Sequence, residues 1–177
     1  MVAGRATLTR PTTAPSPPEP TGDMHVTSPA RGEGDGPFSI PVRIYYEDTE
    51  VGGVVYYANY LRYLERARTE WLRAAGFELD VIQRDMRAVF VVRRVEADYH
   101  LPALLGNMIT VTAEPTEVGA SRLVIRQRVL RRGDGVDELL LSATVTLAFI
   151  ASDLSGPIRM PPLLRAAMKS TLLPIAE

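Results

Sequence analysis

Cysteine is absent from the 177-residue chain, and histidine occurs only as His25 and His100. Without cysteine the chain has no disulfide, thiolate metal site, iron–sulfur cluster or cysteine nucleophile. Two histidines that lie 75 positions apart are too few to ligate zinc unless carboxylates supply the other ligands. A metal centre and thiol chemistry are therefore not expected.

An excess of charge of either sign is also missing, because 20 lysines and arginines oppose 21 aspartates and glutamates. A general nucleic-acid binder needs a clear basic excess to displace counterions, so no nucleic-acid partner is expected. No run approaches the roughly 18 consecutive apolar residues of a membrane span, and no apolar signal-peptide core follows Met1. The sequence therefore predicts a soluble, cytoplasmic protein.

Large apolar residues are scarce before Phe38, where the composition of the chain changes. Residues 1–37 contain seven of the 14 prolines and five of the 13 glycines. Such a segment cannot bury enough apolar surface to offset the entropy lost on ordering it. We expect residues 1–37 to be a disordered tail and residues 38–177 to form one domain, which is long enough for a stable core.

From residue 38 onward, the hydrophobic pattern predicts a strand, a long helix, a short helix, four strands and a terminal helix. The expected strands cover residues 38–47, 87–100, 108–118, 122–132 and 139–151, and the expected helices cover residues 57–75, 79–85 and 161–168. Glycine-containing turns between the last three strands favour an antiparallel meander. This order predicts a two-layer α+β domain, in which one long helix packs on an antiparallel sheet of about five strands.

The long helix has a single apolar stripe. Apolar residues recur at spacings of three and four, which places them on one face of a helix. Gly76 follows at the position where a left-handed residue commonly ends a helix. The stripe consists of Tyr60, Leu64, Ala67, Trp71 and Ala75.

Most known catalytic motifs are missing, including the nucleophile elbow, the zinc-protease motif and phosphate-binding glycine loops. The informative segment is residues 47–60, where Glu47, Asp48 and Glu50 precede a Gly-Gly pair and the start of the helix. Unpaired amides at a helix start can stabilise negative charge on a carbonyl oxygen, and a nearby carboxylate can attack that carbonyl or activate a water. The residues alone leave a second reading open, in which the acids only decorate a loop and favour the helix dipole.

The segment from Val42 to Leu72, VRIYYEDTEVGGVVYYANYLRYLERARTEWL, resembles the signature of hotdog-fold acyl-CoA thioesterases. More narrowly, it is similar to the Tol-Pal-associated branch of the 4-hydroxybenzoyl-CoA thioesterase family. FVVRR at 90–94 and DYHLPA at 98–103 extend the resemblance, which covers residues 38–165. It implies a long helix wrapped by an antiparallel sheet, and homodimers or tetramers with active sites at the dimer interface.

The resemblance also implies roles for individual residues. Glu50 is the general base or nucleophile toward the thioester carbonyl, and the backbone N–H of Tyr57 polarises the carbonyl oxygen. Gly52 and Gly53 permit close approach of the backbone to the substrate. Asp48 is a backup catalytic carboxylate, and a structural hydrogen-bonding role is the favoured alternative for it. The family usually has aspartate where this chain has Glu50, whose extra methylene moves the carboxylate by about 1.5 Å.

Three further residues complete the implied site. Asn59 orients the helix start, while Arg93 and Arg122 are the candidates for binding the phosphates of coenzyme A. The mechanism requires no metal and no cofactor. The implied activity is hydrolysis of acyl-CoA to a free acid and coenzyme A.

Two other functions remain open. The acyl group can arrive on acyl carrier protein instead of coenzyme A, since both donors favour a basic entrance. Alternatively, the change from aspartate to Glu50 leaves a catalytically weak module that binds acyl thioesters. The sequence determines neither the acyl length nor the choice between dimer and tetramer.

Overall fold

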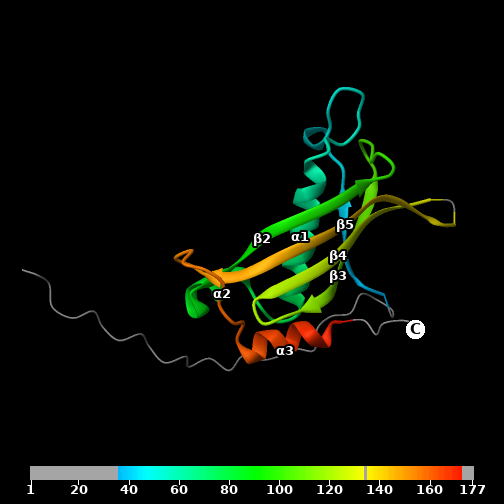
Figure 1. Ribbon diagram of the computed structural model, residues 1–177. Coiled ribbons are helices and arrows are strands. Elements are labelled where there is room, and N and C mark those ends of the chain that lie inside the picture. Colours follow the sequence, from blue (N-terminus) through cyan, green and yellow to red (C-terminus); the bar gives the residue numbers. More distant parts are fainter. Residues whose placement is uncertain (1–35, 134, 173–177) are drawn as a thin grey trace, which may run out of the picture.

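A computed structural model describes residues 36–133 and 135–172, so the expected disordered tail lies almost entirely outside the described residues. Five strands form one antiparallel sheet with the order β1-β3-β4-β5-β2 (Figure 1). The strands are β1 (Phe38–Arg43), β2 (Ala88–Tyr99), β3 (Met108–Val118), β4 (Arg122–Arg132) and β5 (Asp137–Ala151). The predicted meander of the last three strands is confirmed.

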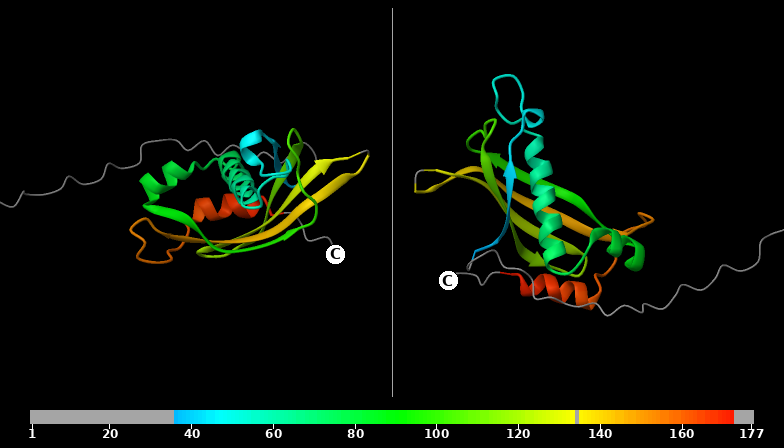
Figure 2. Two further views of the ribbon diagram at one scale, coloured as in Figure 1. Left: turned by 90° about the horizontal axis from the view of Figure 1, so that it is seen from above. Right: turned by 180° about the vertical axis from the view of Figure 1, so that it is seen from behind.

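Within the described residues, three α-helices accompany the sheet: α1 (Asn59–Ala74), α2 (Leu79–Met86) and α3 (Pro162–Ser170). The long helix α1 lies against one face of the curved sheet, and α3 lies across one end of it (Figure 2). This arrangement confirms the prediction of a two-layer α+β domain with one long helix on an antiparallel sheet.

The predicted apolar stripe of α1 forms the centre of the core. All five stripe residues are buried, and Tyr63 and Leu72 join them. Each large side chain of this kind contributes about 1.5–3 kcal/mol when it is fully buried. Burial of the stripe therefore fixes which face of α1 meets the sheet.

The C-terminus of α1 ends as predicted at Gly76, which has a φ of +90°. The Gly76 N–H donates to the Arg73 carbonyl at 2.9 Å, and the Phe77 N–H donates to the Leu72 carbonyl at 3.1 Å. These two bonds form a Schellman motif, which satisfies carbonyls that the helix itself leaves free.

Two predicted boundaries were wrong, and one predicted strand is irregular. The first strand ends at Arg43 rather than at residue 47, because residues 46–48 form a 3-10 turn that the Asp48 carboxylate closes by accepting the Tyr45 N–H at 2.9 Å. The helix begins at Asn59 rather than at residue 57, since the Asn59 N–H closes a turn on the Tyr56 carbonyl. The second strand is interrupted by a bulge at Arg93.

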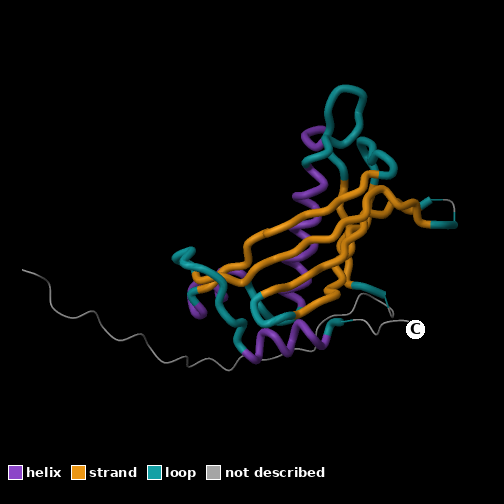
Figure 3. Tube along the Cα trace, in the orientation of Figure 1, coloured by secondary structure: helices purple, strands orange, loops and turns teal. Residues whose placement is uncertain are grey.

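Strand β2 forms one edge of the sheet, because it pairs only with β5 (Figure 3). Its middle section exposes apolar side chains: Val92 is 51% exposed and Val95 is 39% exposed. A single helix is too narrow to cover all five strands, so the region beside this edge stays open.

Gln127 of β4 links the helix to the sheet. It is completely buried, and its Nε2 donates to the Leu64 carbonyl of α1 at 3.0 Å and to the Thr112 carbonyl of β3 at 3.1 Å. Its Oε1 accepts a bond from Nη1 of Arg68 at 2.8 Å. The side chain thereby satisfies its own polar atoms and sets the position of α1 along the sheet.

Among the described residues, no helix combines the length and the apolar character that crossing a membrane requires.

Replacement of Gln127 tests this link. We expect Gln127→Met, which keeps the volume but removes the hydrogen bonds, to lower the free energy of unfolding by about 2–3 kcal/mol, since it leaves buried polar groups unpaired. Urea denaturation measures the change. The control is Arg128→Met, at an exposed neighbouring position, which should change stability by less than about 0.5 kcal/mol. Equal effects of the two substitutions would contradict the role of Gln127.

Candidate active site

The loop that carries Glu50 is a narrow hairpin between the 3-10 turn and α1. Thr49 and Val55 form an isolated antiparallel β-bridge, and the Glu50 N–H donates to the Val54 carbonyl at 3.0 Å. The Gly53 N–H donates a hydrogen bond to the Glu50 carbonyl at 3.0 Å, which closes a tight turn. The loop therefore presents Glu50 at the base of a turn with a defined backbone.

Both glycines of this turn have left-handed backbones, with a φ of +99° at Gly52 and +74° at Gly53. A Cβ added at either position would meet no atom within 4 Å. Within this chain the glycines are therefore required for the shape of the turn rather than for space. Their expected close approach to a substrate remains a prediction.

The hairpin is attached to the segment between β2 and β3. The Val55 N–H donates to the Ala103 carbonyl at 2.9 Å, and the Leu105 N–H donates to the Gly53 carbonyl at 3.0 Å. Tyr60 adds a third link, because its buried hydroxyl accepts the Ala103 N–H at 2.8 Å. Segments that are distant in sequence thus hold the loop against the N-terminus of α1.

Asp48 and Asn59 join the loop to the helix. The Asp48 carbonyl accepts the Asn59 Nδ2–H at 2.9 Å and the Tyr56 N–H at 3.0 Å, while its carboxylate accepts the Tyr45 N–H. Beneath it lies Tyr63, whose pKa is raised by burial and also by the Asp48 carboxylate. The carboxylate of Asp48 thus binds the start of the 3-10 turn, and its backbone carbonyl binds the segment that leads into α1.

A backbone donor is free just before α1 begins, one residue ahead of its N-cap. In the part of the chain that the structure describes, the Tyr57 N–H makes no hydrogen bond, and no side chain caps the helix at Ala58. The hydroxyl of Tyr99 donates to the Tyr57 carbonyl at 3.1 Å, which orients the next peptide, between Tyr57 and Ala58. An unpaired amide at the positive end of a helix dipole can stabilise a developing oxyanion.

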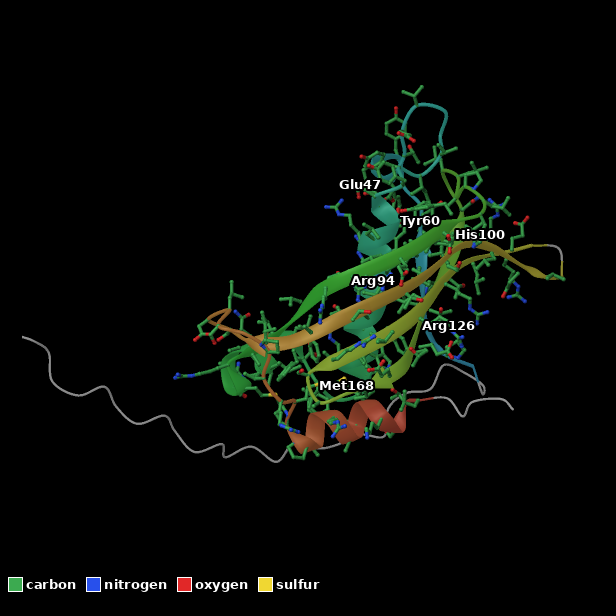
Figure 4. The ribbon with its side chains drawn as sticks, viewed as in Figure 1. Glu47, Tyr60, Arg94, His100, Arg126 and Met168 are labelled. Carbon is green, nitrogen blue, oxygen red and sulfur yellow. The ribbon has the colours of Figure 1, made fainter. Side chains whose placement is uncertain are left out.

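Glu50 lies at the same end of the molecule and is exposed. The pKa of Tyr56 is raised, first by the neighbouring Tyr57 and additionally by the charge of Glu50, so this carboxylate lies within electrostatic reach of the tyrosine pair. Figure 4 places Glu47, Tyr60 and His100 at this end, opposite Met168 on α3. His100 bonds to the Ser142 hydroxyl at 2.9 Å and is exposed.

A groove of about 660 Å³ runs beside α1 from this end of the molecule. Its walls come from α1, from the exposed valines of β2 and from the acidic loop, including Glu47 and Asp48. The groove is open to solvent along the β2 edge.

The two arginines that were expected to bind phosphate lie elsewhere in the chain. Arg93 is the bulge residue of β2, about 20 Å along the strand from Tyr99. Arg122 begins β4 and is level with Val91 of β2, because both residues are register partners of the same residue of β5. It forms a salt bridge with Glu117 at 3.6 Å. One chain therefore does not bring either arginine to Glu50 and Tyr57.

A second cationic feature lies close to Arg122 and was missed in the sequence. A cleft of about 490 Å³ beside Ala120 and α3 is lined by Arg159, Arg165 and Lys169, and its described lining includes no carboxylate. The buried Nε of Arg165 has no hydrogen-bond partner among the residues that the structure describes. The spacing of Arg165 and Lys169, one helical turn apart, was the available signal.

In residues 36–133 and 135–172, no group of three or more histidine or acidic side chains is arranged to hold a metal ion.

Known proteins share this sequence pattern. The family model described as the thioesterase superfamily matches residues 52–138. A protein of Haemophilus influenzae named acyl-CoA thioesterase YbgC is 40% identical over 134 residues, which cover 75% of this chain and 95% of that protein.

Solved structures share the fold. A probable thioesterase from Bartonella henselae superposes with a TM-score of 0.66 at 30% identity, covering 71% of this chain and 100% of that one. A mutant 4-hydroxybenzoyl CoA thioesterase, crystallised with 4-hydroxybenzoyl CoA, superposes with a TM-score of 0.68 at 20% identity, covering 75% of this chain and 96% of that one. The second likeness concerns the fold alone. Together they confirm the expected hotdog arrangement of helix and sheet.

The turn at Gly52 and Gly53 is open to a direct test. Gly53→Ala should lower the free energy of unfolding by about 1–2 kcal/mol, because alanine is strained at positive φ even where space is available. The control is Gly36→Ala, at a glycine with equally free surroundings and no positive φ, which should be neutral. Thermal unfolding of both variants measures the difference, and equal melting temperatures would refute the backbone argument.

Proposed function

The chain belongs to the thioesterase superfamily, and on this basis we propose that it is an acyl-CoA thioesterase. It hydrolyses the acyl–sulfur bond of acyl-CoA and releases a free carboxylic acid and coenzyme A. The observation that carries this proposal is the 40% identity to an acyl-CoA thioesterase over 134 residues, which include the whole acidic loop and α1. The unpaired Tyr57 amide and the exposed Glu50 carboxylate, which belong to the same loop region, would supply the chemistry that the reaction needs.

Thioester hydrolysis places negative charge on the carbonyl oxygen when the carbon is attacked. The Tyr57 N–H, assisted by the α1 dipole, would donate to this oxygen and stabilise the tetrahedral intermediate. Glu50 would take a proton from the attacking water, or would itself attack to form an anhydride that water then hydrolyses. In the first route, the thiolate of coenzyme A leaves when the carbon–sulfur bond breaks and takes the proton that Glu50 removed from the water. In the second route, the thiolate leaves as the anhydride forms, and the water that hydrolyses the anhydride supplies the proton.

Glu50 replaces the shorter aspartate that the resemblance leads one to expect. Its longer side chain extends from a turn whose backbone is held by hydrogen bonds on both sides. A misplacement of about 1 Å can cost on the order of 100-fold in rate, so the length of this arm sets the activity. Turnover should therefore depend on the carboxylate and also on its reach.

We further propose that two chains pair through their β2 edges. An exposed edge strand with apolar side chains is a template for pairing with another strand, and most homo-oligomers have two-fold symmetry. Antiparallel pairing about an axis near the middle of β2 would also cover the groove and bury Val92 and Val95. In this arrangement the sheets of the two chains would form one continuous sheet.

Such a dimer would bring opposite ends of the two chains together. The Glu50 and Tyr57 end of one chain would face the partner's end that carries Arg122 and the cationic cleft at α3. The cleft offers three cations to the phosphates of coenzyme A, while Arg93 would lie near the two-fold axis. The separation of these groups within one chain then has a simple reason: each active site is assembled from two chains.

Substitution of Glu50 tests the catalytic assignment. Release of thiol from acyl-CoA is followed with a thiol-reactive dye, and the absence of cysteine means that the protein adds no signal. We expect Glu50→Gln to lower kcat by at least about 100-fold, because the amide neither accepts a proton nor attacks. Glu50→Asp, which keeps the carboxylate but shortens its reach, should lower kcat less than Glu50→Gln does. Glu138→Gln, an exposed change at a distant ion pair, is the control and should be neutral.

Other outcomes separate the alternatives. Full turnover by Glu50→Gln would mean that Asp48, or a water held by the loop, acts as the base instead. Binding of acyl-CoA without turnover by the wild-type protein would identify a binding module. Acyl-acyl carrier protein, assayed in parallel, would be the donor if its kcat/KM exceeded that of every acyl-CoA.

The shared site is tested by complementation. One inactive chain carries Glu50→Gln, and the other carries Arg159→Glu, Arg165→Glu and Lys169→Glu in the cleft. Co-refolding should restore about a quarter of the wild-type activity, because half of the dimers are mixed and each mixed dimer has one intact site. Each chain refolded alone is the control. No recovery, with mixed dimers confirmed by mass, would refute a site built from two chains.

A further inference from the structure

The turn that leads into α1 contains a second free backbone donor beside the Tyr57 N–H. The Asn59 N–H closes this turn on the Tyr56 carbonyl at 2.9 Å, and Ala58 within it has a φ of −72° and a ψ of −21°. A closed turn with a negative φ at its third residue is of type I, in which the second residue, Tyr57, is right-handed too. Successive amides of a right-handed segment point the same way, so the Ala58 N–H lies alongside the Tyr57 N–H. Neither amide has a hydrogen-bond partner within residues 36–133 and 135–172.

The carbonyl of the Tyr57–Ala58 peptide is held by a side chain instead of by the helix. In a regular helix it would accept the N–H of Leu61, four residues later, but this N–H donates to the Ala58 carbonyl at 3.2 Å. The Tyr99 hydroxyl takes that place and donates to the Tyr57 carbonyl at 3.1 Å. One peptide therefore accepts the Tyr99 hydroxyl at its oxygen and presents its own N–H, that of Ala58, on the opposite side.

Tyr99 is itself held in position from the sheet. It is the last residue of β2, where it pairs with Leu141 of β5. Its ring stands edge-on to the ring of Tyr60, at a centroid distance of 5.6 Å and an interplanar angle of 87°. Tyr60 is buried, and its hydroxyl accepts the Ala103 N–H. The position of the Tyr99 hydroxyl is therefore set by the sheet and by a packed neighbour, and not by the loop that it contacts.

The Tyr99 hydroxyl also keeps its proton at neutral pH. Burial raises the pKa of Tyr99 above the usual value of a tyrosine, and the neighbouring Tyr57 and Tyr60 raise it further. A tyrosine already titrates near pH 10 in water, so the hydroxyl is a hydrogen-bond donor wherever the enzyme would work.

A donor at a peptide oxygen affects the N–H of the same peptide. Hydrogen bonds in a chain polarise one another and strengthen each other by about 10–30%. A direct donor to an oxyanion is worth about 100- to 1,000-fold in kcat, so strengthening it by this fraction is worth several-fold. The gain is largest where the substrate oxygen carries the most negative charge, which is in the transition state.

We propose that Tyr99 is a positioning residue for thioester hydrolysis: it holds and polarises the Tyr57–Ala58 peptide, so that the Ala58 N–H is a second donor to the thioester carbonyl oxygen. The inference rests on the proposed thioesterase function and adds to the single donor assigned there to Tyr57. Tyr99 transfers no proton, because its hydroxyl stays bonded to the Tyr57 carbonyl throughout the reaction.

The experiment removes the hydroxyl and then restores a donor. Tyr99→Phe keeps the ring against Tyr60, and we expect kcat with acyl-CoA to fall about 3- to 10-fold at an unchanged KM. Replacement of Tyr99 by para-aminophenylalanine returns an N–H donor at the same ring position and should restore most of the kcat. Tyr46→Phe also removes one hydroxyl at this end, from a side chain that is 83% exposed, and is the neutral control.

A spectroscopic measurement separates this role from a general loss of structure. The amide proton resonance of Ala58, followed by NMR in isotope-labelled protein, reports the polarisation of its peptide. We expect it to shift upfield in Tyr99→Phe, because the peptide oxygen loses its donor, and to stay in place in Tyr46→Phe.

Every other outcome has a defined meaning. A kcat of Tyr99→Phe equal to that of the wild type would overturn the proposal, and so would a rise in KM at constant kcat, which is the mark of a substrate-binding residue. A fall in kcat with an unmoved Ala58 amide proton, or without recovery by para-aminophenylalanine, would also overturn it. Absence of turnover with every acyl-CoA by the folded wild-type protein would instead refute the thioesterase function itself.

Discussion

The position of α1 on the sheet is the constraint on which the rest of the structure depends. Burial of one apolar stripe selects the face of the helix, but hydrophobic contact alone permits sliding along the sheet. The buried Gln127 removes this freedom, because its hydrogen bonds to α1 and β3 are satisfied in one position only. The N-terminus of α1, and with it the free Tyr57 amide, is thereby placed relative to the strands.

The loop before α1 depends on the same placement. Its hairpin is closed locally by two left-handed glycines, but it is held in space by contacts with Ala103 and Leu105, which lie about 50 residues farther along the chain. The Asp48 carboxylate accepts a hydrogen bond from the backbone of the 3-10 turn, whereas Glu50 stays exposed. This division of labour between two neighbouring carboxylates supports the choice of Glu50 as the reacting group in the proposed mechanism.

A single helix covers only part of a five-stranded sheet, and the uncovered β2 edge has consequences for function. It leaves apolar side chains, a groove and a small pocket on one side of α1. The cationic cleft beside α3 lies at the end of the molecule opposite to Glu50. Pairing of two chains through this edge would resolve both features at once, since it covers the apolar surface and joins the separated parts of the proposed site.

The sequence by itself determined the order of elements, the buried stripe of α1, its end at Gly76 and the acidic loop, because these depend on local periodicity and backbone preference. It misplaced the end of β1 and the start of α1, where the side chain of Asp48 and a turn at Tyr56 compete with the regular pattern. Only the tertiary structure decided that Arg93 and Arg122 lie far from Glu50, and that Arg159, Arg165 and Lys169 form one cleft. Such proximity depends on strand order and on the bulge in β2, and neither leaves a periodic signal in the chain.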